Sequence, residues 1–352
     1  MQRLPLFVAL LLGNLAASAE TPLKQAYGDA FGVGVAVQAA QLERATESAL
    51  VKRHFGMVVS EYQMKANVLA PRAGEYDYSA ADAIVAFAEA NDMRVRGHAL
   101  VWHQSTPGWF LEGGDPAVIR VRLETYVRDV VGRYRGRIFA WDVVNEAASD
   151  AGGTYRESSW YRATGKDYID WAFKAARQAD PDCLLFLNDY GTERNAKLER
   201  VMAVVTDLTE RGVPIDGVGH QFHLGRGQAI SGIHEALDAV AEARLLSHIT
   251  ELDVSAYNDP GSCYRDRTGC RPPLAEDAIP EFTTEQAHLY RAVFDAARDR
   301  PSVRAVLTWG LHDGQSWLNR FPVRRTNHPL LFDRNLEPKP ALNALLDPAY
   351  ER

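Results

Sequence analysis

The stretch Ile138–Ala147 reads IFAWDVVNEA, and its pattern decides how the rest of the chain is interpreted. Its apolar part is short enough for a buried strand, and it ends on the polar pair Asn145 and Glu146. The stretch His248–Asp253 (HITELD) has the same form, because an apolar run there ends on Glu251. Each carboxylate therefore stands at the end of a predicted strand.

Outward from these two stretches, eight short runs rich in β-forming residues alternate with helical patterns. The runs are Phe31–Val37, Met57–Ser60, Arg94–Leu100, Ile138–Val144, Cys183–Asn188, Gly217–Phe222, Leu245–Thr250 and Val303–Trp309. Strands that alternate with helices predict a parallel sheet, and eight is the number that closes a (β/α)8 TIM barrel. We therefore expect an α/β protein built on a single barrel.

Three of the intervening segments carry apolar residues at helical spacing, namely Ala80–Asn91, Asp167–Ala179 and Glu281–Arg300. Thr283 and Thr284 are candidate N-caps for the last of these helices. No linker rich in Pro, Gly or Ser divides the sequence. We therefore predict one domain over residues 20–352.

Residues 1–19 are typical of a secretory signal peptide, with Arg3 ahead of an apolar stretch and small residues at 17–19. We expect export to the periplasm or the extracellular space, and no later segment is apolar enough for a transmembrane helix. In an oxidising compartment, Cys263 and Cys270 are expected to form a disulfide and Cys183 a buried thiol. The alternative for the pair is two free loop thiols.

The formal net charge of the chain is −7, and no basic cluster stands out. This balance argues against nucleic acid and against anionic membrane surfaces as partners, because both select for patches of Lys and Arg. A neutral polymer suits the charge better. We expect a monomer.

The barrel restricts where chemistry takes place, because active side chains in this fold gather at the carboxyl ends of the strands. Polar and aromatic residues do stand at those ends. They are Glu61, His98, Trp102, Asn145, Glu146, Asn188, Asp189, Tyr190, Gln221, His223, Glu251, Asp253 and Trp309. We expect these side chains to converge at one mouth of the barrel.

Glu146 and Glu251 end the fourth and seventh predicted strands, so they face each other across that mouth. Paired carboxyl groups hydrolyse glycosidic bonds, and their separation decides the stereochemistry of the product. A separation of about 5–5.5 Å gives retention through a covalent intermediate, and about 6.5–9.5 Å gives inversion. We predict the shorter separation. A single such glutamate is more often a solvated loop charge, but a pair framed by Asn, His, Gln and Trp favours catalysis.

Six motifs in the chain resemble those of one enzyme family, and they stand in that family's order. They are Gly97–Gln104 (GHALVWHQ), Trp141–Ala147 (WDVVNEA), Leu187–Tyr190 (LNDY), Gly219–His223 (GHQFH), Ile249–Asp253 (ITELD) and Thr308–Trp317 (TWGLHDGQSW). The chain is similar to glycoside hydrolase family 10, the (β/α)8 retaining endo-β-1,4-xylanases. The resemblance extends from about Phe31 to Leu342, which is nearly the whole sequence after residue 19.

The resemblance implies that Glu146 is the acid/base and that Glu251 is the nucleophile. The acid must be protonated near neutral pH while the nucleophile is ionised, so their surroundings have to push the two pKa values apart. A relay from Asp253 through His223 would orient Glu251 and keep it charged. The alternative is that His223 is a hydrogen-bonded core imidazole.

The resemblance also implies a set of sugar-binding residues, with Asn145 donating to the 2-hydroxyl group. Aromatic faces suit pyranose rings, because these rings present apolar C–H surfaces. The expected set is Glu61, Lys65, His98, Trp102, Asn145, Tyr190, Gln221, Trp309 and Trp317. Without its motif, Lys65 is typical of a surface lysine. The expected partner is xylan or a xylo-oligosaccharide, and no cofactor or metal is implied, because protein carboxyl groups supply the acid, base and nucleophile.

The chain departs from the family pattern at the second glycone sugar. Tyr62 and Ala66 replace an Asn and a Trp of the usual motif, and Leu318 replaces an Arg. One alternative is therefore a retaining barrel hydrolase that acts on another β-linked or decorated glycan. Another is a catalytically silent carbohydrate-binding protein, since a fold alone does not grant activity.

Overall fold

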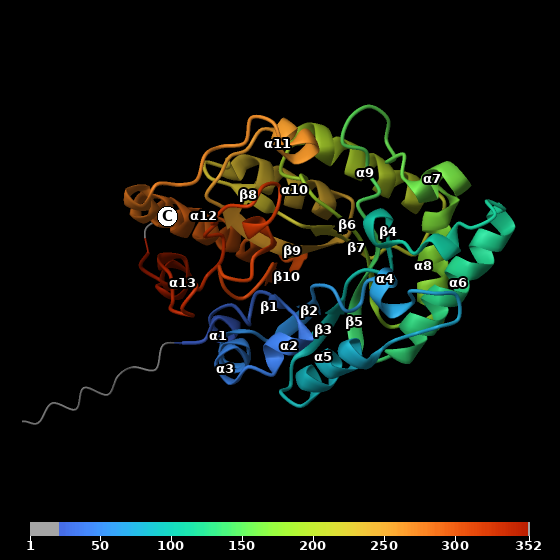
Figure 1. The fold of residues 1–352 in the computed structure, drawn as a ribbon, viewed down its shortest axis with the longest axis horizontal. Coiled ribbons are helices and arrows are strands. Elements are labelled where there is room, and N and C mark those ends of the chain that lie inside the picture. Colours follow the sequence, from blue (N-terminus) through green and yellow to red (C-terminus); the bar gives the residue numbers. More distant parts are fainter. Residues whose placement is uncertain (1–20, 351–352) are drawn as a thin grey trace, which may run out of the picture.

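The structure, a computed structural model, describes residues 21–350 and contains a closed barrel of parallel strands (Figure 1). The barrel strands are β1 (Gly32–Val37), β2 (Met57–Ser60), β3 (Arg94–Gly97), β5 (Ile138–Asn145), β6 (Leu184–Asp189), β7 (Gly217–His220), β9 (Leu246–Ser255) and β10 (Val303–Thr308). They pair in this order, and β10 also pairs with β1, which closes the barrel. The predicted (β/α)8 fold is confirmed.

Helices surround the strands on the outside of the barrel (Figure 1). The helices are α1 (Leu23–Ala26), α2 (Ala39–Leu42), α3 (Ala45–His54), α4 (Ala66–Leu69), α5 (Ser79–Glu89), α6 (Pro116–Arg133), α7 (Ser159–Thr164), α8 (Asp167–Ala179), α9 (Asn195–Glu210), α10 (Ile230–Glu242), α11 (Gly261–Asp266), α12 (Ile279–Arg298) and α13 (Pro340–Leu346). Short 3-10 turns follow at His103–Ser105, Gly108–Phe110, Glu276–Ala278 and Trp317–Asn319.

Two predicted strands end earlier than their apolar runs, because the backbone turns at the mouth of the barrel. The predicted Gly217–Phe222 strand stops at His220, since Phe222 adopts a positive φ of 46°, and the chain resumes as β8 (His223–Gly225). The third predicted strand likewise stops at Gly97 and resumes as β4 (Val101–Trp102). These short strands extend the sheet, because β4 pairs with β5 and β8 pairs with β9.

The prediction that Thr283 and Thr284 cap the last long helix is wrong. Helix α12 begins at Ile279, with Pro280 in its first turn, where the missing N–H group costs nothing. Both threonine hydroxyls lie inside the helix and donate to the carbonyl of Pro280, at 3.0 and 3.1 Å. The other two predicted helices correspond to α5 and α8.

Apolar side chains fill the space between the strands and the helices. Trp141 is fully buried there. Its ring lies against Gly97, where an added Cβ would come within 2.1 Å of Cε3 of the ring. The neighbouring strands β3 and β5 can therefore pack this indole only because position 97 is glycine.

The predicted signal peptide, residues 1–19, lies outside the described residues. Across residues 21–350, no helix is both long enough and apolar enough to cross a membrane. The predicted disulfide is present: Cys263 and Cys270 are bonded, at an S–S distance of 1.99 Å. Cys183 is a buried free thiol, as predicted.

Candidate active site

The two predicted catalytic carboxylates lie on β5 and β9, where Glu146 follows the end of β5 and Glu251 lies inside β9. Glu146, directly after β5, is 7 % exposed, and Glu251, within β9, is 4 % exposed. Glu146 adopts a positive φ of 59°, which is rare for a residue other than glycine and is typical of functional sites. The backbone therefore bends at the residue whose side chain has to leave the strand direction.

The carboxylate of Glu251 is surrounded by hydrogen-bond donors. Asn188 donates from Nδ2 to Oε1 of Glu251 at 2.8 Å, and Nε2 of His223 lies 3.2 Å from Oε2. Nδ1 of His98 is 3.9 Å from Oε1. Burial alone would raise the pKa of Glu251, but the hydrogen bond and charge of His223 and the charge of His98 lower it below its ordinary value. Glu251 is thus ionised.

The carboxyl group of Glu146 has the opposite environment. Burial raises its pKa first, and the neighbouring Asp189 raises it further, so that the pKa of Glu146 reaches about 7. The nearest amide donors, Asn145 and Gln221, lie 3.4 Å from its Oε1, which is too far to favour the ionised form strongly. Two carboxyl groups of one site therefore differ in their protonation near neutral pH.

His223 joins Glu251 to a second buried carboxylate. Its Nδ1 lies 3.1 Å from Oδ2 of Asp253, and the register of β8 and β9 places the two residues side by side. Burial would lower the pKa of His223, but Asp253 and Glu251 raise it to about 10. Trp317 donates from Nε1 to the same Oδ2 of Asp253 at 2.8 Å. The geometry of the expected relay is therefore present.

A hydrogen-bond network of side-chain amides lies between the two glutamates. Asn188 donates to Oδ1 of Asn145 at 2.8 Å, and Gln221 donates to the same oxygen at 3.2 Å. Thr250 donates to Oδ1 of Asn188 at 2.7 Å, and the orientation of that amide is settled by its Nδ2, which donates to the carboxylate of Glu251. Because Oδ1 of Asn145 accepts from both neighbours, its Nδ2 points to the Glu146 side.

Lys65 is only 7 % exposed and is not an ordinary surface lysine. Its ammonium group lies 4.7 Å from the ring centroids of both Tyr62 and Trp102, within cation–π range. Glu61 is held by Gln38, which donates to its Oε2 at 2.7 Å. Tyr62, which replaces the expected amide, is 43 % exposed beside this group. The predicted glycone residues therefore gather around one cation.

The predicted aromatic residues lie on two sides of the glutamates. Trp309 packs edge-on against His98 at 5.2 Å, and Trp317 packs against His223 at 4.9 Å. Tyr190, at the end of β6, instead belongs to a charged cluster, because its hydroxyl donates to Asp150 at 2.6 Å. Most of the predicted site residues thus lie at or directly after the carboxyl ends of strands, whereas Glu251 and Asp253 lie within β9, and Lys65 and Trp317 lie in the connections that follow β2 and β10.

The sequence did not reveal several buried partners of the predicted residues. Asp142 accepts a hydrogen bond from Nδ1 of His98 at 2.9 Å and pairs with both terminal nitrogens of Arg96. Arg156 and Asp150 form a second charged pair, next to Glu146. Asn188 stood in a quoted motif but was not assigned a role.

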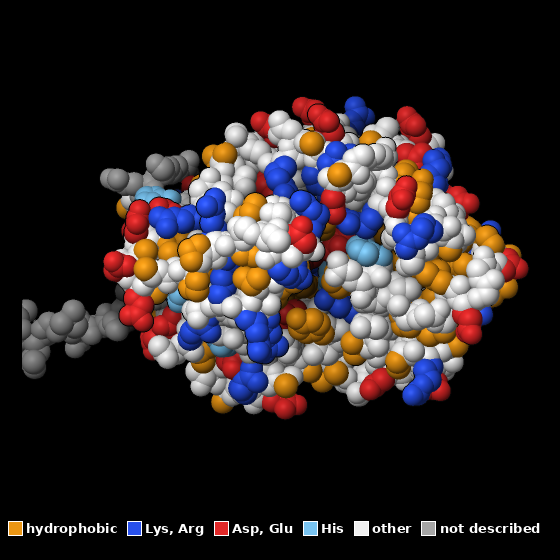
Figure 2. Space-filling model, turned by 45° about the horizontal axis from the view of Figure 1, so that its top comes forward, with side chains coloured by type: hydrophobic (Ala, Val, Ile, Leu, Met, Phe, Trp, Pro, Cys, Tyr) orange, Lys and Arg blue, Asp and Glu red, His pale blue; other side chains and the backbone are white. Residues whose placement is uncertain are grey.

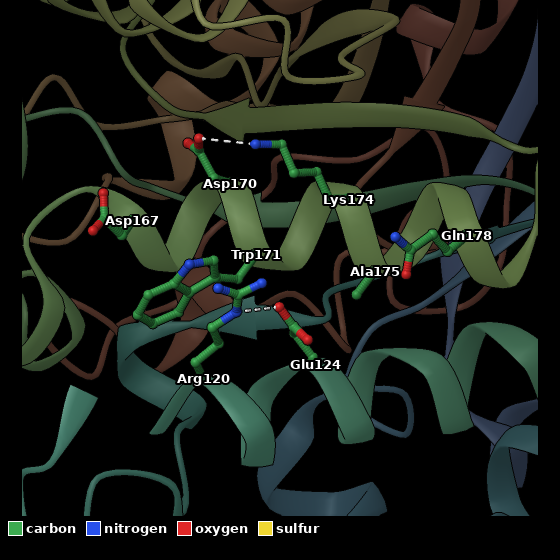
Figure 3. Close-up of a pocket in the computed structure, with 8 residues that line it drawn as sticks. All are labelled: Arg120, Glu124, Asp167, Asp170, Trp171, Lys174, Ala175 and Gln178. Atoms are coloured by element: carbon green, nitrogen blue, oxygen red, sulfur yellow. Dashed lines mark hydrogen bonds and ion pairs between the residues drawn. The ribbon is translucent and has the colours of Figure 1, made fainter. Parts of the chain in front are cut away.

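The surface shows few features outside the predicted site that suggest another active site. Figure 2 shows acidic side chains recessed beside a histidine near the centre of one face, with Lys and Arg side chains around them. A groove between α6 and α8 is lined by Arg120, Glu124, Asp167, Asp170, Trp171, Lys174, Ala175 and Gln178, and none of these belongs to the predicted site (Figure 3). Among residues 21–350, no group of His, Cys, Asp or Glu side chains could hold a metal ion.

The chain is similar to known proteins in both sequence and overall structure. The family model described as Glycosyl hydrolase family 10 matches residues 22–348. The "Thermostable celloxylanase" of Thermoclostridium stercorarium is 41 % identical over 94 % of this chain and 88 % of its own length. "Endo-1,4-beta-xylanase B" of Paenibacillus barcinonensis is 39 % identical over 92 % of this chain and 97 % of its own. The crystal structure of xylanase B from Clostridium stercorarium F9 is similar at a TM-score of 0.86 and 39 % identity, and the match covers 93 % of this chain and 99 % of that one.

Proposed function

Because the chain belongs to glycosyl hydrolase family 10, we propose that it hydrolyses internal β-1,4 linkages of xylan with retention of configuration. In this proposal Glu146 is the acid/base and Glu251 is the nucleophile. The observation that carries the proposal is the divergence of their pKa values: that of Glu146 is raised to about 7, and that of Glu251 is lowered. Such divergence is what assigns an acid and a nucleophile to two carboxyl groups of one site.

In the first step, an oxygen of Glu251 attacks the anomeric carbon while Glu146 gives its proton to the glycosidic oxygen. The bond from the anomeric carbon to the leaving chain breaks, and a bond to the Glu251 carboxylate forms. In the second step, Glu146 takes a proton from water, whose oxygen displaces Glu251 from the anomeric carbon. Both carboxyl groups then return to their starting protonation states.

The surrounding residues have roles that fit these steps. The Nδ2 group of Asn145 is placed to donate to the 2-hydroxyl, a hydrogen bond that strengthens as charge develops on the sugar ring. Gln221 and Lys65 supply further donors, and Glu61 supplies an acceptor on the glycone side. His98, Trp102, Trp309 and Trp317 form the walls, and Tyr190 faces the leaving group. His223 and Asp253 orient the nucleophile.

The substrate class is the part of the proposal that rests on the relatives. Two of the similar proteins are named as an endo-1,4-beta-xylanase and a celloxylanase, so xylo- and cello-oligosaccharides have to be compared directly. Tyr62 and Ala66 depart from the family motif and so favour a second possible substrate, a decorated or different β-linked glycan. A silent binding protein is disfavoured, because both carboxyl groups and their donors are present.

The test is product analysis on linear xylo-oligosaccharides beside cello-oligosaccharides of equal length. We expect internal cleavage of the xylo-series, and proton NMR of the first products should detect the β-anomer. The Glu251→Ala protein controls for contaminating activity. If the parent cleaves neither series, the proposed function is wrong. If Glu251→Ala cleaves as well as the parent, the proposed nucleophile is wrong.

We further propose that the protein is exported and acts as a monomer outside the cytoplasm. The Cys263–Cys270 disulfide supports export, because such bonds persist in oxidising compartments. Secretion of a fusion that carries residues 1–19, compared with one that lacks them, tests the signal peptide, and light scattering of the purified protein tests the oligomeric state.

A further inference from the structure

Residues 146–158 connect β5 to α7, and this connection folds back against Tyr190 through a cluster of charged side chains. Arg156 holds Asp150 with two hydrogen bonds, from Nη1 to Oδ2 at 2.8 Å and from Nη2 to Oδ1 at 3.0 Å. The hydroxyl of Tyr190 completes the cluster, since it donates to Oδ2 of Asp150 at 2.6 Å and accepts from Nη2 of Arg156 at 2.9 Å. Lys197 adds a second cation, 3.1 Å from Asp150.

The remaining donor of Arg156 reaches the acid/base residue itself. Nε of Arg156 donates to the backbone carbonyl of Glu146 at 2.7 Å. One planar guanidinium group therefore contacts Glu146, Asp150 and Tyr190 together, and its donors keep a fixed mutual geometry. A lysine at this position has a single nitrogen and cannot reproduce the fork.

Glu146 is held through its backbone as well as through its side chain. Asn145 and Gln221 lie 3.4 Å from its Oε1, and contact with Trp102 lowers the pKa of its carboxyl group. Its backbone is held on both sides, because its N–H donates to the carbonyl of Asn188 at 2.7 Å and its own carbonyl accepts from Arg156. With a φ of 59°, this backbone conformation persists only where its surroundings impose it.

We propose that Arg156 is a positioning residue that couples the Tyr190 side of the cleft to the acid/base Glu146, so that leaving-group protonation depends on this arginine. The inference rests on the proposed function, since it takes Glu146 as the acid. Tyr190 and Asp150 hold the arginine, and the arginine holds the backbone from which the carboxyl group projects. Arg156 lies outside all six motifs of the resemblance.

The charged groups around Glu146 also predict how the loss of Arg156 changes the pH dependence of activity. Burial raises the pKa of Glu146 most, and Asp189 on β6 and Glu251 on β9 raise it further, whereas contact with Trp102 and the charge of Arg156 lower it. Lys65, before α4, is another cation that interacts with Glu146. Removal of the Arg156 charge therefore raises the pKa of Glu146, and the alkaline limb of activity moves to higher pH.

The experiment compares two aryl β-xylobiosides that differ only in the leaving group. 2,4-Dinitrophenolate leaves without protonation, whereas phenolate needs the acid. For Arg156→Gln, we expect kcat/KM on the phenyl substrate to fall about 10–100-fold, which is the size of loss expected when a catalytic group is misplaced. On the dinitrophenyl substrate, we expect less than about a threefold change.

Arg200→Gln is the matched control. Arg200 holds the same connection through the carbonyls of Ser149 and Asp150, both at 2.9 Å, but it does not contact Glu146. We expect this variant to keep the parent's ratio between the two substrates. Arg156→Lys should have its alkaline limb at the same pH as the parent, because the positive charge remains. It should nevertheless lose activity on the phenyl substrate, because lysine lacks the several donors of the guanidinium group.

Tyr190→Phe provides a milder change if Arg156→Gln does not fold, since it removes one hydroxyl from the cluster. We expect it to change the ratio in the same direction by a smaller factor. The inference is overturned if the Arg156 and Tyr190 variants lose both substrates equally, or if Arg200→Gln changes the ratio as much. If the parent cleaves neither aryl xylobioside, the proposed function fails instead, so the two failures are distinguishable.

Discussion

His223 lies between two carboxylates, with Nε2 3.2 Å from Oε2 of Glu251 and Nδ1 3.1 Å from Oδ2 of Asp253. Together these carboxylates raise the pKa of His223 to about 10 against the effect of burial, so the imidazole is protonated through the neutral range. The three groups then carry one net negative charge instead of two. The buried carboxylate of Glu251 remains ionised because the histidine cation stands beside it.

The first prediction concerns the pH dependence of the parent enzyme. Since the nucleophile must be ionised, kcat/KM should fall on the acid side only below the ordinary glutamate value of 4.5, because the pKa of Glu251 is lowered. Since the acid must be protonated, kcat/KM should fall on the alkaline side as pH rises through about 7, the pKa of Glu146. Rates on xylo-oligosaccharides between about pH 3 and pH 9 measure both limbs. A profile flat up to pH 9 would contradict the assignment of Glu146.

The second prediction follows from the charge of Asp253. In Asp253→Asn, His223 loses the carboxylate that keeps it protonated, so Glu251 loses its neighbouring cation as pH rises. The pKa of Glu251 then rises, and we expect the acid limb of kcat/KM to move up by about one pH unit. The same pH series on the variant provides the measurement. Glu61→Gln is the control, because it removes a carboxylate that has no contact with His223, and an equal shift in that variant would count against the relay.

The third prediction concerns Asn188, which donates to the nucleophile. Asn188→Ala removes a hydrogen bond to a charged oxygen, a loss of about 1.5–3 kcal/mol, and should lower kcat/KM about 10–100-fold. Thr250→Val removes only the hydroxyl that orients this amide and should cost less. Steady-state rates on xylotetraose at one pH separate the two variants. An Asn188→Ala protein within twofold of the parent would show that this contact does not assist the nucleophile.

The barrel could be predicted because its signals are local. Each strand is a short apolar run, and each is followed by a helical pattern, so the alternation gives both the parallel sheet and the closure. The errors in the predicted strands lie where the backbone leaves the strand direction. Phe222 belongs to an apolar run, but its φ of 46° ends β7, and periodicity contains no information about a bend of this kind.

The central site residues could be predicted because they follow strand ends within recognisable motifs. Their partners could not be predicted, because no local pattern in the sequence marks them. Arg96 and Asp142 lie 46 residues apart and meet inside the barrel. Arg156 stands in a loop with no apolar periodicity, and only the folded chain brings it to the carbonyl of Glu146.

The fourth prediction concerns the disulfide on the loop that carries α11. Cys263 and Cys270 close a short loop, for which loss of the bond costs about 2–3 kcal/mol of unfolding free energy in the chain-entropy account. We expect Cys263→Ser/Cys270→Ser to unfold at lower temperature than the parent while its activity at 25 °C is retained. The parent in dithiothreitol should match the double variant, and the variant should not respond to the reductant. If dithiothreitol lowers the Tm of both proteins equally, the bond is not the cause.

The last prediction concerns Asp142, which links the barrel interior to the site. Asp142 and Arg96 are both fully buried, and the guanidinium group together with His98 lowers the pKa of Asp142 despite its burial. Asp142→Asn leaves Arg96 as a buried charge without its counter-ion, so we expect a loss of about 3–5 kcal/mol in urea unfolding. The same change in the half-exposed pair of Asp82 and Arg133 should cost about 1 kcal/mol or less, because solvent screens that pair. Asp142→Asn should also lower kcat, because the neutral amide is a weaker acceptor than the carboxylate for the His98 Nδ1 group that Asp142 orients. Equal stability losses in the two variants would mean that burial adds nothing to the Arg96–Asp142 pair.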